Sequence, residues 1–213
     1  MREETLIIFV KLPVAGRVKT RLAREVGSGR ATALFRHMLA RTYAAARGRW
    51  RAVLAVDPPA ALHDRVWPCD FDRMAQGKGD LGARMKDAFA AFDGPTVIIG
   101  ADAPCVRASH VRQAFRALGR HDAVFGPAQD GGYWLIGLAG RKRAPNLFAG
   151  VRWSSAHALQ DTVETLPPNF SIAFLETLQD VDEAKDLAAL GPMSAAGPAT
   201  FAKKGGRRSA IAG

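Results

Sequence analysis

The sequence predicts a three-layer α/β/α domain of the Rossmann-like kind with a mostly parallel central sheet, and three observations support this fold class. Short apolar, β-branched segments at residues 6–10, 50–56 and 96–100 have the composition of buried strands. A helix-forming segment at residues 31–47 separates the first two of them. Strand, helix, strand is how a parallel sheet begins, and in such sheets ligands bind beyond the carboxyl ends of the strands.

The composition indicates one folded domain over residues 1–190. The chain has 213 residues, of which 48% are apolar, which is enough for a sizeable core. No apolar stretch approaches the roughly 20 residues that cross a bilayer, and the acids near the N-terminus do not fit a secretory signal. Cys69 and Cys105 lack the spacing of a disulfide framework or a zinc site. We therefore expect a cytoplasmic protein.

The net charge of +10 suggests an anionic partner. Four of the positive charges belong to residues 191–213, a tail rich in Ala, Gly and Ser that is expected to be disordered. The others are spread over several expected helices, and only 8% of the residues are aromatic, so the aromatic side chains that stack on bases are too few. The sequence therefore favours small-molecule substrates over nucleic acid or a membrane, and leaves a homodimer open.

A basic segment follows the first expected strand, at the edge where a ligand would bind. Its members are the cations Lys11, Arg17, Lys19 and Arg21 and the interrupting residues Pro13 and Gly16. Like charges this close repel one another, so the simplest reason for the cluster is a polyanion such as the phosphates of a nucleotide. The segment matches neither the Walker loop nor the Gly-x-Gly-x-x-Gly fingerprint, and a plain solvated loop is the alternative.

Residues 73–92 begin as a glycine-punctuated loop and end as an amphipathic helix. This places Gln76, Gly79 and Asp80 at a helix N-terminus, where free N–H groups can meet a base or a phosphate. We expect these residues and Arg84 to line the base pocket of a nucleotide site. A plain helix cap is the alternative for Asp80.

Carboxylates at two places are candidate metal ligands. The strand at residues 96–100 leads into Asp102, and Pro104 keeps the residue before it extended, so Asp102 is expected at the carboxyl end of the strand. Mg²⁺ is typically held by one or two carboxylates together with phosphate oxygens. Asp180 and Asp182 alternate in a second segment, and one of them is the natural second ligand. A helix cap for Asp102 and a solvated helix start for the other two are the alternatives.

Asp130, Gly131 and Gly132 lie between two further expected strands, residues 123–126 and 133–138. Paired glycines permit close backbone approach to a ligand, which suggests an acceptor site, although a hairpin turn alone would explain them. No histidine lies in a metal-ligand or triad pattern, and no serine lies in a nucleophile elbow. The sequence therefore does not indicate covalent or general acid–base catalysis. Phosphoryl and glycosyl transfer need mainly positioning and charge neutralisation.

Five segments together resemble a bacterial family of transferases associated with radical-SAM and selenium-domain gene neighbourhoods. They are residues 9–22, 76–85, 100–104, 126–133 and 180–187. The resemblance implies the glycosyltransferase-A (GT-A) fold of the nucleotide-diphospho-sugar transferases, with more distant similarity to phospholactate guanylyltransferase and molybdenum cofactor guanylyltransferase. In those enzymes the counterpart of the basic segment holds the nucleotide phosphates and the counterpart of Asp102 binds Mg²⁺. A late acidic or amide motif completes their site.

The resemblance also guides the predicted reaction. Sugar transferases of this fold usually carry a metal-binding Asp-x-Asp, whereas residues 101–104 contain one acid. We therefore predict a nucleotidyltransferase that moves NMP from an NTP to a small phosphorylated or hydroxyl acceptor and releases pyrophosphate. Lys19, Arg21 and Asp102 would be its catalytic residues, with Mg²⁺ or Mn²⁺ as cofactor. The alternatives are sugar transfer from a nucleotide-diphospho-sugar and nucleotide binding without catalysis.

Overall fold

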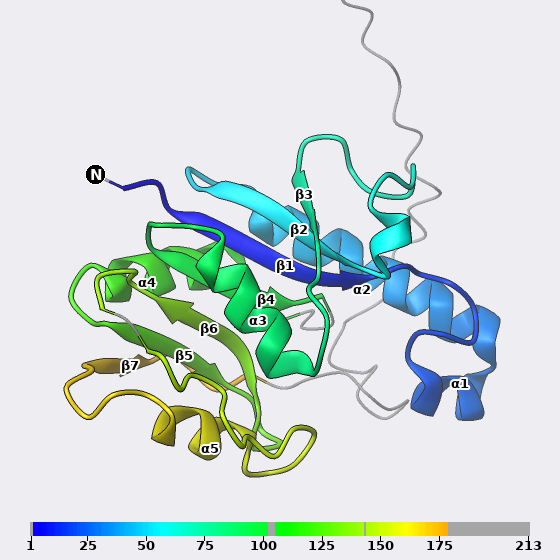
Figure 1. Ribbon diagram of the computed structural model, residues 1–213. Helices are drawn as coiled ribbons and strands as arrows, with labels where there is room; N and C mark the ends of the chain where they lie inside the picture. Colours follow the sequence, from blue (N-terminus) through cyan, green and yellow to red (C-terminus); the bar gives the residue numbers. More distant parts are fainter. Residues whose placement is uncertain (1, 102–104, 143, 179–213) are drawn as a thin grey trace, which may run out of the picture.

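Within the described residues, seven strands form one sheet (Figure 1). The structure is a computed structural model that describes residues 2–101, 105–142 and 144–178. The strands are β1 (Thr5–Lys11), β2 (Arg51–Asp57), β3 (Asp72–Ala75), β4 (Thr96–Gly100), β5 (Ala123–Pro127), β6 (Tyr133–Leu138) and β7 (Ile172–Phe174). Their order is β3-β2-β1-β4-β6-β5-β7, with β6 antiparallel to both neighbours and the other pairs parallel. The predicted α/β fold with a mostly parallel central sheet is confirmed.

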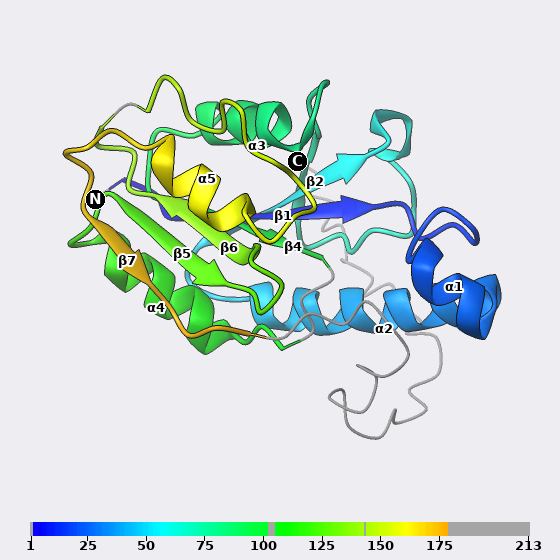
Figure 2. The same cartoon turned by 90° about the horizontal axis from the view of Figure 1, so that it is seen from below.

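Helices cover both faces of the sheet (Figure 2). They are α1 (Thr20–Val26), α2 (Ser28–Ala46), α3 (Leu81–Ala90), α4 (Ala108–Leu118) and α5 (Ala158–Glu164). Helices α2 and α4 lie on one face, and α3 and α5 lie on the other. Among the described helices, none combines the length and apolar character that crossing a lipid bilayer requires.

The alternation of side chains along each strand divides the core into two layers. On β1, Leu6, Ile8 and Val10 belong to the layer with α2 and α4, whereas Ile7 belongs to the layer with α3 and α5. All four side chains are fully buried, and each such burial stabilises the fold by about 1.5–3 kcal/mol. Because both faces of β1 are covered, its sequence is continuously apolar from Leu6 to Val10, which is why the strand is easy to recognise.

The strand register brings several chain segments to one edge of the sheet. Lys11 and Asp57, the last residues of β1 and β2, are direct partners, and Gly100 at the end of β4 pairs with Phe9. Since β6 is antiparallel, its first residue, Tyr133, starts at this same edge. The segments that follow β1, β3, β4 and β5 therefore meet at this carboxyl edge, where ligands bind in sheets of this type.

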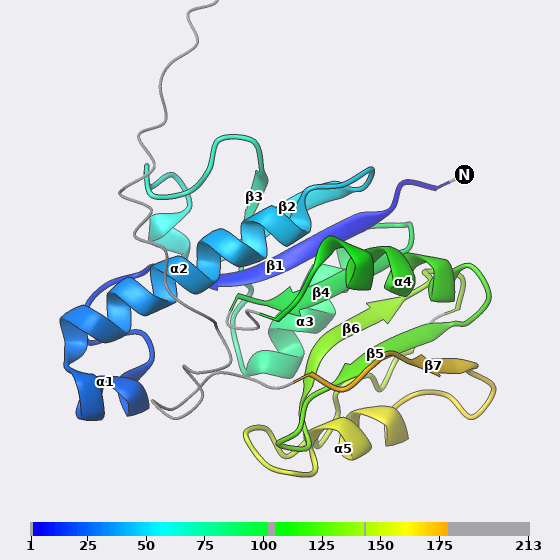
Figure 3. The same cartoon turned by 180° about the vertical axis from the view of Figure 1, so that it is seen from behind.

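Helix α1 lies within the segment that the sequence predicted as a basic loop. It is stabilised by tertiary packing, because the fully buried Leu22 contacts a cluster that includes Leu34 and Met38 of α2 (Figure 3). A helix of seven residues is too short to show a clear periodic pattern or to be stable by itself. The predicted loop therefore ends at Lys19, and Arg21 lies in the first turn of α1.

The segment between β2 and α3 also differs from the expectation. Its alanine-rich start forms only a 3₁₀ turn, at Pro59–Ala61, and not a longer helix. The Asp64 carboxylate accepts the Val66 N–H at 2.9 Å, and this local bond favours a turn over a continued helix. The sequence also missed β3, a four-residue edge strand that pairs in parallel with β2 and leads directly into Gln76.

Asp122 joins β7 to the start of β5 at the end of the sheet opposite the carboxyl edge. Its Oδ2 atom accepts hydrogen bonds from Lys142 Nζ at 2.8 Å and from the N–H and Oγ of Ser171 at 3.0 and 2.9 Å. The Lys142 bond and then the Ser171 N–H bond lower the pKa of the Asp122 carboxyl from 3.8 to about 2. Because its pKa is lowered by folding, Asp122 stabilises the protein above about pH 4, and this contribution is lost as the pH falls through about 2.

We expect Asp122→Asn to lower the free energy of unfolding by about 1.5–3 kcal/mol, because the charge-assisted bonds are lost. For a chain of this size this corresponds to a melting temperature lower by about 3–12 °C at pH 7. Thermal unfolding measured between pH 7 and pH 2 should also show that the variant loses less stability in acid than the wild type. The control is Asp72→Asn, whose exposed pair with Arg51 is worth at most about 1 kcal/mol. Equal effects of both substitutions would contradict this account.

Candidate functional site

A pocket of about 950 Å³ opens at the carboxyl edge of the sheet. Its lining comes from the ends of β1 and β4, the start of β6, the segment around the start of α1, the start of α3 and the loop before α5. Figure 1 shows α1, the amino end of α3 and the β5–β6 turn around this end of the sheet. The predicted site residues in the lining are Lys11, Arg17, Lys19, Arg21, Gln76, Gly79, Asp80, Arg84 and Asp130.

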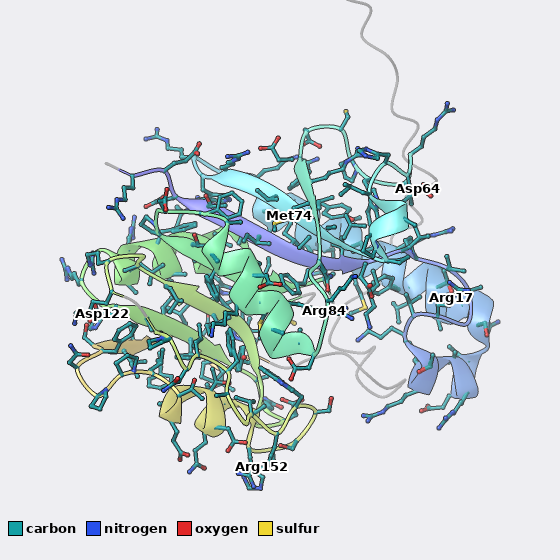
Figure 4. All side chains as sticks on the ribbon, in the orientation of Figure 1. Arg17, Asp64, Met74, Arg84, Asp122 and Arg152 are labelled. Carbon is teal, nitrogen blue, oxygen red and sulfur yellow. The ribbon has the colours of Figure 1, made fainter. Side chains whose placement is uncertain are left out.

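Five cations line the pocket and form what we call the basic wall: Lys11, Arg17, Lys19, Arg21 and Arg84. The first four come from the predicted basic segment and the fifth from α3. Figure 4 shows Arg17 and Arg84 at the same end of the sheet, whereas Asp122 lies at the other end. Arg17 and Arg21 are exposed, and Lys19 has a left-handed backbone with φ 46° as the N-cap residue of α1. Such a concentration of charge favours anions in this part of the pocket.

Pro13 and Gly16 shape the basic segment without lining the pocket. Pro13 is buried, and its carbonyl accepts a hydrogen bond from Arg36 at 3.4 Å. Gly16 has φ 78°, a conformation that glycine adopts without strain, and it lies in the tight turn in which the Arg17 N–H donates to the Val14 carbonyl at 3.1 Å. Both residues therefore direct the following cations toward the pocket.

Gln76 is a buried link between strand ends, with only 7% of its surface exposed. Its Nε2 donates to the Val10 carbonyl at 3.2 Å and to the Ala55 carbonyl at 3.0 Å, so both amide hydrogens are used within the protein. Its Oε1 lies 3.4 Å from Arg84, which also donates from Nε to the Gly79 carbonyl at 3.0 Å and pairs with Asp57 at 3.6 Å. Gln76 therefore positions Arg84 in the pocket lining.

Replacement of Gln76 by Glu should lower the free energy of unfolding by at least about 2 kcal/mol. The Val10 and Ala55 carbonyls would lose the amide group that donates to them, and a carboxylate oxygen would take its place. We expect the melting temperature to fall by at least about 4–8 °C. The comparison is Gln113→Glu, the same change at an exposed position of α4, which should leave the melting temperature nearly unchanged. A tolerated Gln76→Glu would show that Gln76 does not hold the strand ends together.

Asp80 and Gly79 start helix α3. Asp80 is the N-cap residue, and its Oδ1 accepts the Ala83 N–H at 2.8 Å, so the helix-cap interpretation of this residue is correct. Gly79 has φ 95° in the turn before the cap. Both residues also line the pocket, beside the exposed Leu81. The start of α3 thus combines a stable cap with a surface that faces the pocket.

Asp130, Gly131 and Gly132 form the turn between the antiparallel strands β5 and β6, so the hairpin that was the alternative interpretation of these residues is present. Asp130 Oδ1 accepts the Gly132 N–H at 2.9 Å, and Asp130 lines the pocket. Gly131 has φ 84° and packs so closely on the next loop that a Cβ atom would overlap the carbonyl of Ala156. Gly131 and Gly132 themselves lie outside the lining and hold the turn in place.

The side of the pocket formed by this turn and the loop before α5 is here called the acceptor wall: Asp130, Tyr133, Ser154, Ser155 and Ala156. Ser154 has φ 56°, a left-handed conformation that costs a non-glycine residue about 1–2 kcal/mol. Burial raises the pKa of the Tyr133 hydroxyl above its ordinary value, so this hydroxyl stays neutral. Between the two walls, the floor of the pocket is apolar and includes Phe9, Met85, Ile98 and Ile136.

The predicted metal ligands Asp102, Asp180 and Asp182 lie outside the described residues. Ala101, immediately before Asp102, lines the pocket. Helix α4 begins at Ala108 with Arg107 as its N-cap residue, so the alternative that Asp102 caps this helix is wrong. Within residues 2–101, 105–142 and 144–178, no group of three His, Cys, Asp or Glu side chains could hold a metal ion.

The sequence did not identify Tyr133, Ser154 and Ser155 as site residues. Tyr133 follows the Asp-Gly-Gly turn as the first residue of β6. A sequence-based prediction that β6 is antiparallel would have placed Tyr133 at the carboxyl edge. Ser154 and Ser155 lie in an irregular loop without a motif, and the contact between Gly131 and Ala156 brings this loop to the pocket. Only the folded chain reveals that contact.

Solved structures share this fold. A proposed nucleotide-diphospho-sugar transferase from Desulfovibrio desulfuricans G20 is 34% identical, with a TM-score of 0.79, over 89% of this chain and 87% of that chain. The 4-diphosphocytidyl-2C-methyl-D-erythritol synthase from Anaerococcus prevotii DSM 20548 is 8% identical, with a TM-score of 0.55, over 89% and 94%. The manganese complex of Rv0371C from Mycobacterium tuberculosis H37Rv is 15% identical, with a TM-score of 0.51, over 89% and 98%. The fold is therefore that of nucleotide-diphospho-sugar transferases, as the resemblance implied.

A family model also matches the chain. The matched residues are 39–155, more than half of the sequence, and the family is described as an uncharacterized protein conserved in bacteria. This range includes the start of α3, the end of β4 and the β5–β6 turn, all of which contribute to the pocket. No curated protein gives a significant match. On the family model and the 34% identical structure together, the chain belongs to the bacterial family DUF2064.

Proposed function

We propose that the protein is a metal-dependent nucleotidyltransferase that transfers NMP from an NTP to a small acceptor and releases pyrophosphate. The observation that carries this proposal is the basic wall, which places five cations in one pocket at the carboxyl edge of the sheet. A triphosphate is the common small ligand whose charge best matches such a cluster. The fold shared with nucleotide-diphospho-sugar transferases supports the use of a nucleotide donor.

In this mechanism, Lys11, Arg17, Lys19 and Arg21 bind the phosphates of the donor. An acceptor oxygen attacks the α-phosphorus in line, and the bond from that phosphorus to the oxygen bridging the α- and β-phosphates breaks. Lys19 and Arg21 stabilise the negative charge that develops on the departing pyrophosphate. The region around Gly79, Asp80 and Arg84 is proposed to receive the nucleoside, with Gln76 acting through Arg84.

Asp102, together with Asp180 or Asp182, is proposed to hold Mg²⁺ or Mn²⁺. Carboxylates are the ligands that these ions prefer, and Ala101 brings the chain to the pocket immediately before Asp102. The manganese complex of Rv0371C shows that a protein of this fold can bind such an ion. A bound metal would neutralise charge on the donor phosphates.

Sugar transfer from a nucleotide-diphospho-sugar is the second candidate. It is favoured by the 34% identical structure, which is described as a proposed nucleotide-diphospho-sugar transferase. In that reaction the basic wall would bind the two phosphates of the departing nucleoside diphosphate. Five cations are more than two phosphates require, which is why we place nucleotidyl transfer first.

The released product distinguishes these functions. The protein is incubated with each of the four NTPs or with nucleotide sugars, an acceptor mixture and Mg²⁺ or Mn²⁺, and the products are separated and identified by mass spectrometry. Release of pyrophosphate with an NMP-containing product is expected. Release of a nucleoside diphosphate with a glycosylated product would select sugar transfer, and nucleotide binding without any product would favour a non-catalytic nucleotide-binding protein.

A further inference from the structure

The acceptor wall differs in charge from the basic wall of the same pocket. Lys11 ends β1 and Arg84 contacts Asp57 at the end of β2, whereas Asp130 and Tyr133 belong to the β5–β6 turn, on the other side of β4 in the sheet order. Among the described lining residues, the acceptor wall holds one carboxylate, Asp130, beside the hydroxyls of Tyr133, Ser154 and Ser155. A phosphorylated acceptor on this wall would bring its negative charge toward Asp130, with no cation of the described wall to offset the repulsion. An uncharged acceptor meets no such penalty.

Asp130 is held in one orientation and keeps an oxygen available. Its Oδ1 accepts the Gly132 N–H at 2.9 Å. The loop before α5 holds the β5–β6 turn in place. The Leu159 N–H donates to the Gly131 carbonyl at 3.0 Å, and Gly131 packs on Ala156. Among the described residues, no cation pairs with Asp130, so its Oδ2 can accept a proton from a ligand.

Ser154 offers a hydroxyl beside this carboxylate. Ser155 Oγ donates to the Arg152 carbonyl at 2.6 Å, and the Tyr133 hydroxyl lies 3.4 Å from Thr162 Oγ1, so both of these groups have partners. Ser154 is exposed to solvent, and its hydroxyl makes no hydrogen bond within the described part of the chain, while its backbone holds a left-handed conformation. A strained residue with an unused polar group in a pocket lining suggests a role in ligand binding.

We propose that the acceptor wall binds an uncharged, hydroxyl-bearing acceptor such as a polyol or sugar, with Asp130 as the general base and Ser154 as a hydrogen-bonding partner of the acceptor. This inference rests on the proposed transfer function, but not on the choice of donor. In nucleotidyl transfer the acceptor oxygen bonds to the α-phosphorus, the bond to the bridging oxygen of pyrophosphate breaks, and the hydroxyl proton passes to Asp130 Oδ2. In sugar transfer the oxygen bonds to the anomeric carbon instead, the bond from that carbon to the nucleoside diphosphate breaks, and the proton follows the same path.

The test compares matched acceptors, each offered with the donor that binds the full-length protein. The pairs are glycerol with glycerol 3-phosphate, glucose with glucose 1-phosphate, and inositol with inositol 1-phosphate. We expect transfer to the neutral member of a pair and not to its phosphate ester. Asp130→Asn should lower kcat by about 10²–10⁴-fold without changing donor affinity, because a general base is lost while the basic wall is intact.

The control for Asp130→Asn is Asp64→Asn. Asp64 Oδ1 accepts the Val66 N–H at 2.9 Å in the same kind of turn, and Figure 4 shows Asp64 away from Arg84 on another part of the surface. Ser154→Gly gives a second readout: relief of backbone strain should keep or raise the melting temperature, while the KM for the neutral acceptor rises about 5–10-fold. A role in folding alone would lower the melting temperature and leave this KM unchanged.

Two results would overturn the inference: transfer to the phosphate esters in preference to the neutral acceptors, or an Asp130→Asn variant with unchanged kcat. Failure of the proposed function is a different result, because the wild-type protein would then bind no nucleotide donor, or would bind one and transfer it to neither member of any acceptor pair. Donor titration together with the acceptor pairs therefore separates the two failures.

Discussion

The double variant Arg17→Ala/Arg21→Ala is expected to bind the nucleotide donor about 10²–10⁴-fold more weakly than the wild type. Both guanidinium groups lie in the basic wall, and a hydrogen bond to a charged group contributes about 1.5–3 kcal/mol. Two such contacts together give the stated range. Both side chains are exposed, so the fold should tolerate their removal. Calorimetric titration of the donor in the presence of Mg²⁺ measures the change.

Arg112→Ala/Arg116→Ala is the matched control for that variant. These arginines are also exposed and four residues apart, but they lie on α4 rather than in the pocket at the carboxyl edge. The control removes the same net charge, so it reports the general electrostatic attraction of the protein for the donor. We expect a change of less than about 3-fold. Equal losses in the two double variants would mean that donor binding does not depend on the basic wall.

Asp102→Asn is expected to lower turnover by about 10²–10⁴-fold, because the amide cannot supply the charge that a divalent metal requires. Donor binding by the variant should also lose its dependence on Mg²⁺ or Mn²⁺. The two effects are measured by steady-state product formation and by donor titration with and without metal. Unfolding of the ligand-free variant checks that the protein still folds.

Asp93→Asn is the control for the Asp102 variant. Asp93 is exposed and precedes β4 in the sequence, whereas Asp102 follows that strand. The two variants therefore make the same Asp-to-Asn change before and after one strand. The control should keep the activity and the metal dependence of the wild type. If Asp102→Asn stays fully active, the proposed metal site is incorrect.

Several strands could be predicted because burial on both faces leaves a strong signal in the sequence. β1 is apolar from Leu6 to Val10 and β4 from Val97 to Ile99, and the sequence located β4 at the residues where it occurs. Helix α1 left no such signal, because its stability comes from the packing of Leu22 on α2 rather than from its own seven residues. The edge strand β3 is short and carries charged residues, so it resembles a loop.

Much of the pocket lining could be predicted for a simple physical reason. Polar and charged residues at the carboxyl ends of parallel strands lie at the same edge of the sheet. Lys11 at the end of β1 and Gln76 after β3 therefore lie at this edge, with the residues that follow them. What the side chains do there was less predictable. Gln76 was expected to face a base, but its amide is used by two strand carbonyls, and this depends on a three-strand geometry that no local pattern encodes.

The acceptor wall shows the limit of sequence reasoning most clearly. Asp130 was recognised from its turn, but Ser154 reaches the pocket only because Gly131 has no side chain and the loop before α5 packs on it. Contacts between segments that are more than twenty residues apart have no signature in a single sequence. The proposal that the acceptor is uncharged therefore rests on the structure and not on a sequence pattern.

Thermal unfolding with each NTP and with nucleotide sugars, in the presence and absence of Mg²⁺ or Mn²⁺, tests whether the basic wall binds a nucleotide donor together with a divalent metal. At a donor concentration a hundred times the dissociation constant, the ligand adds about 2.7 kcal/mol, which raises the melting temperature of a chain of this size by about 5–11 °C. We predict a shift of this size with one NTP, only when metal is present. No shift with any nucleotide, with or without metal, would contradict the account.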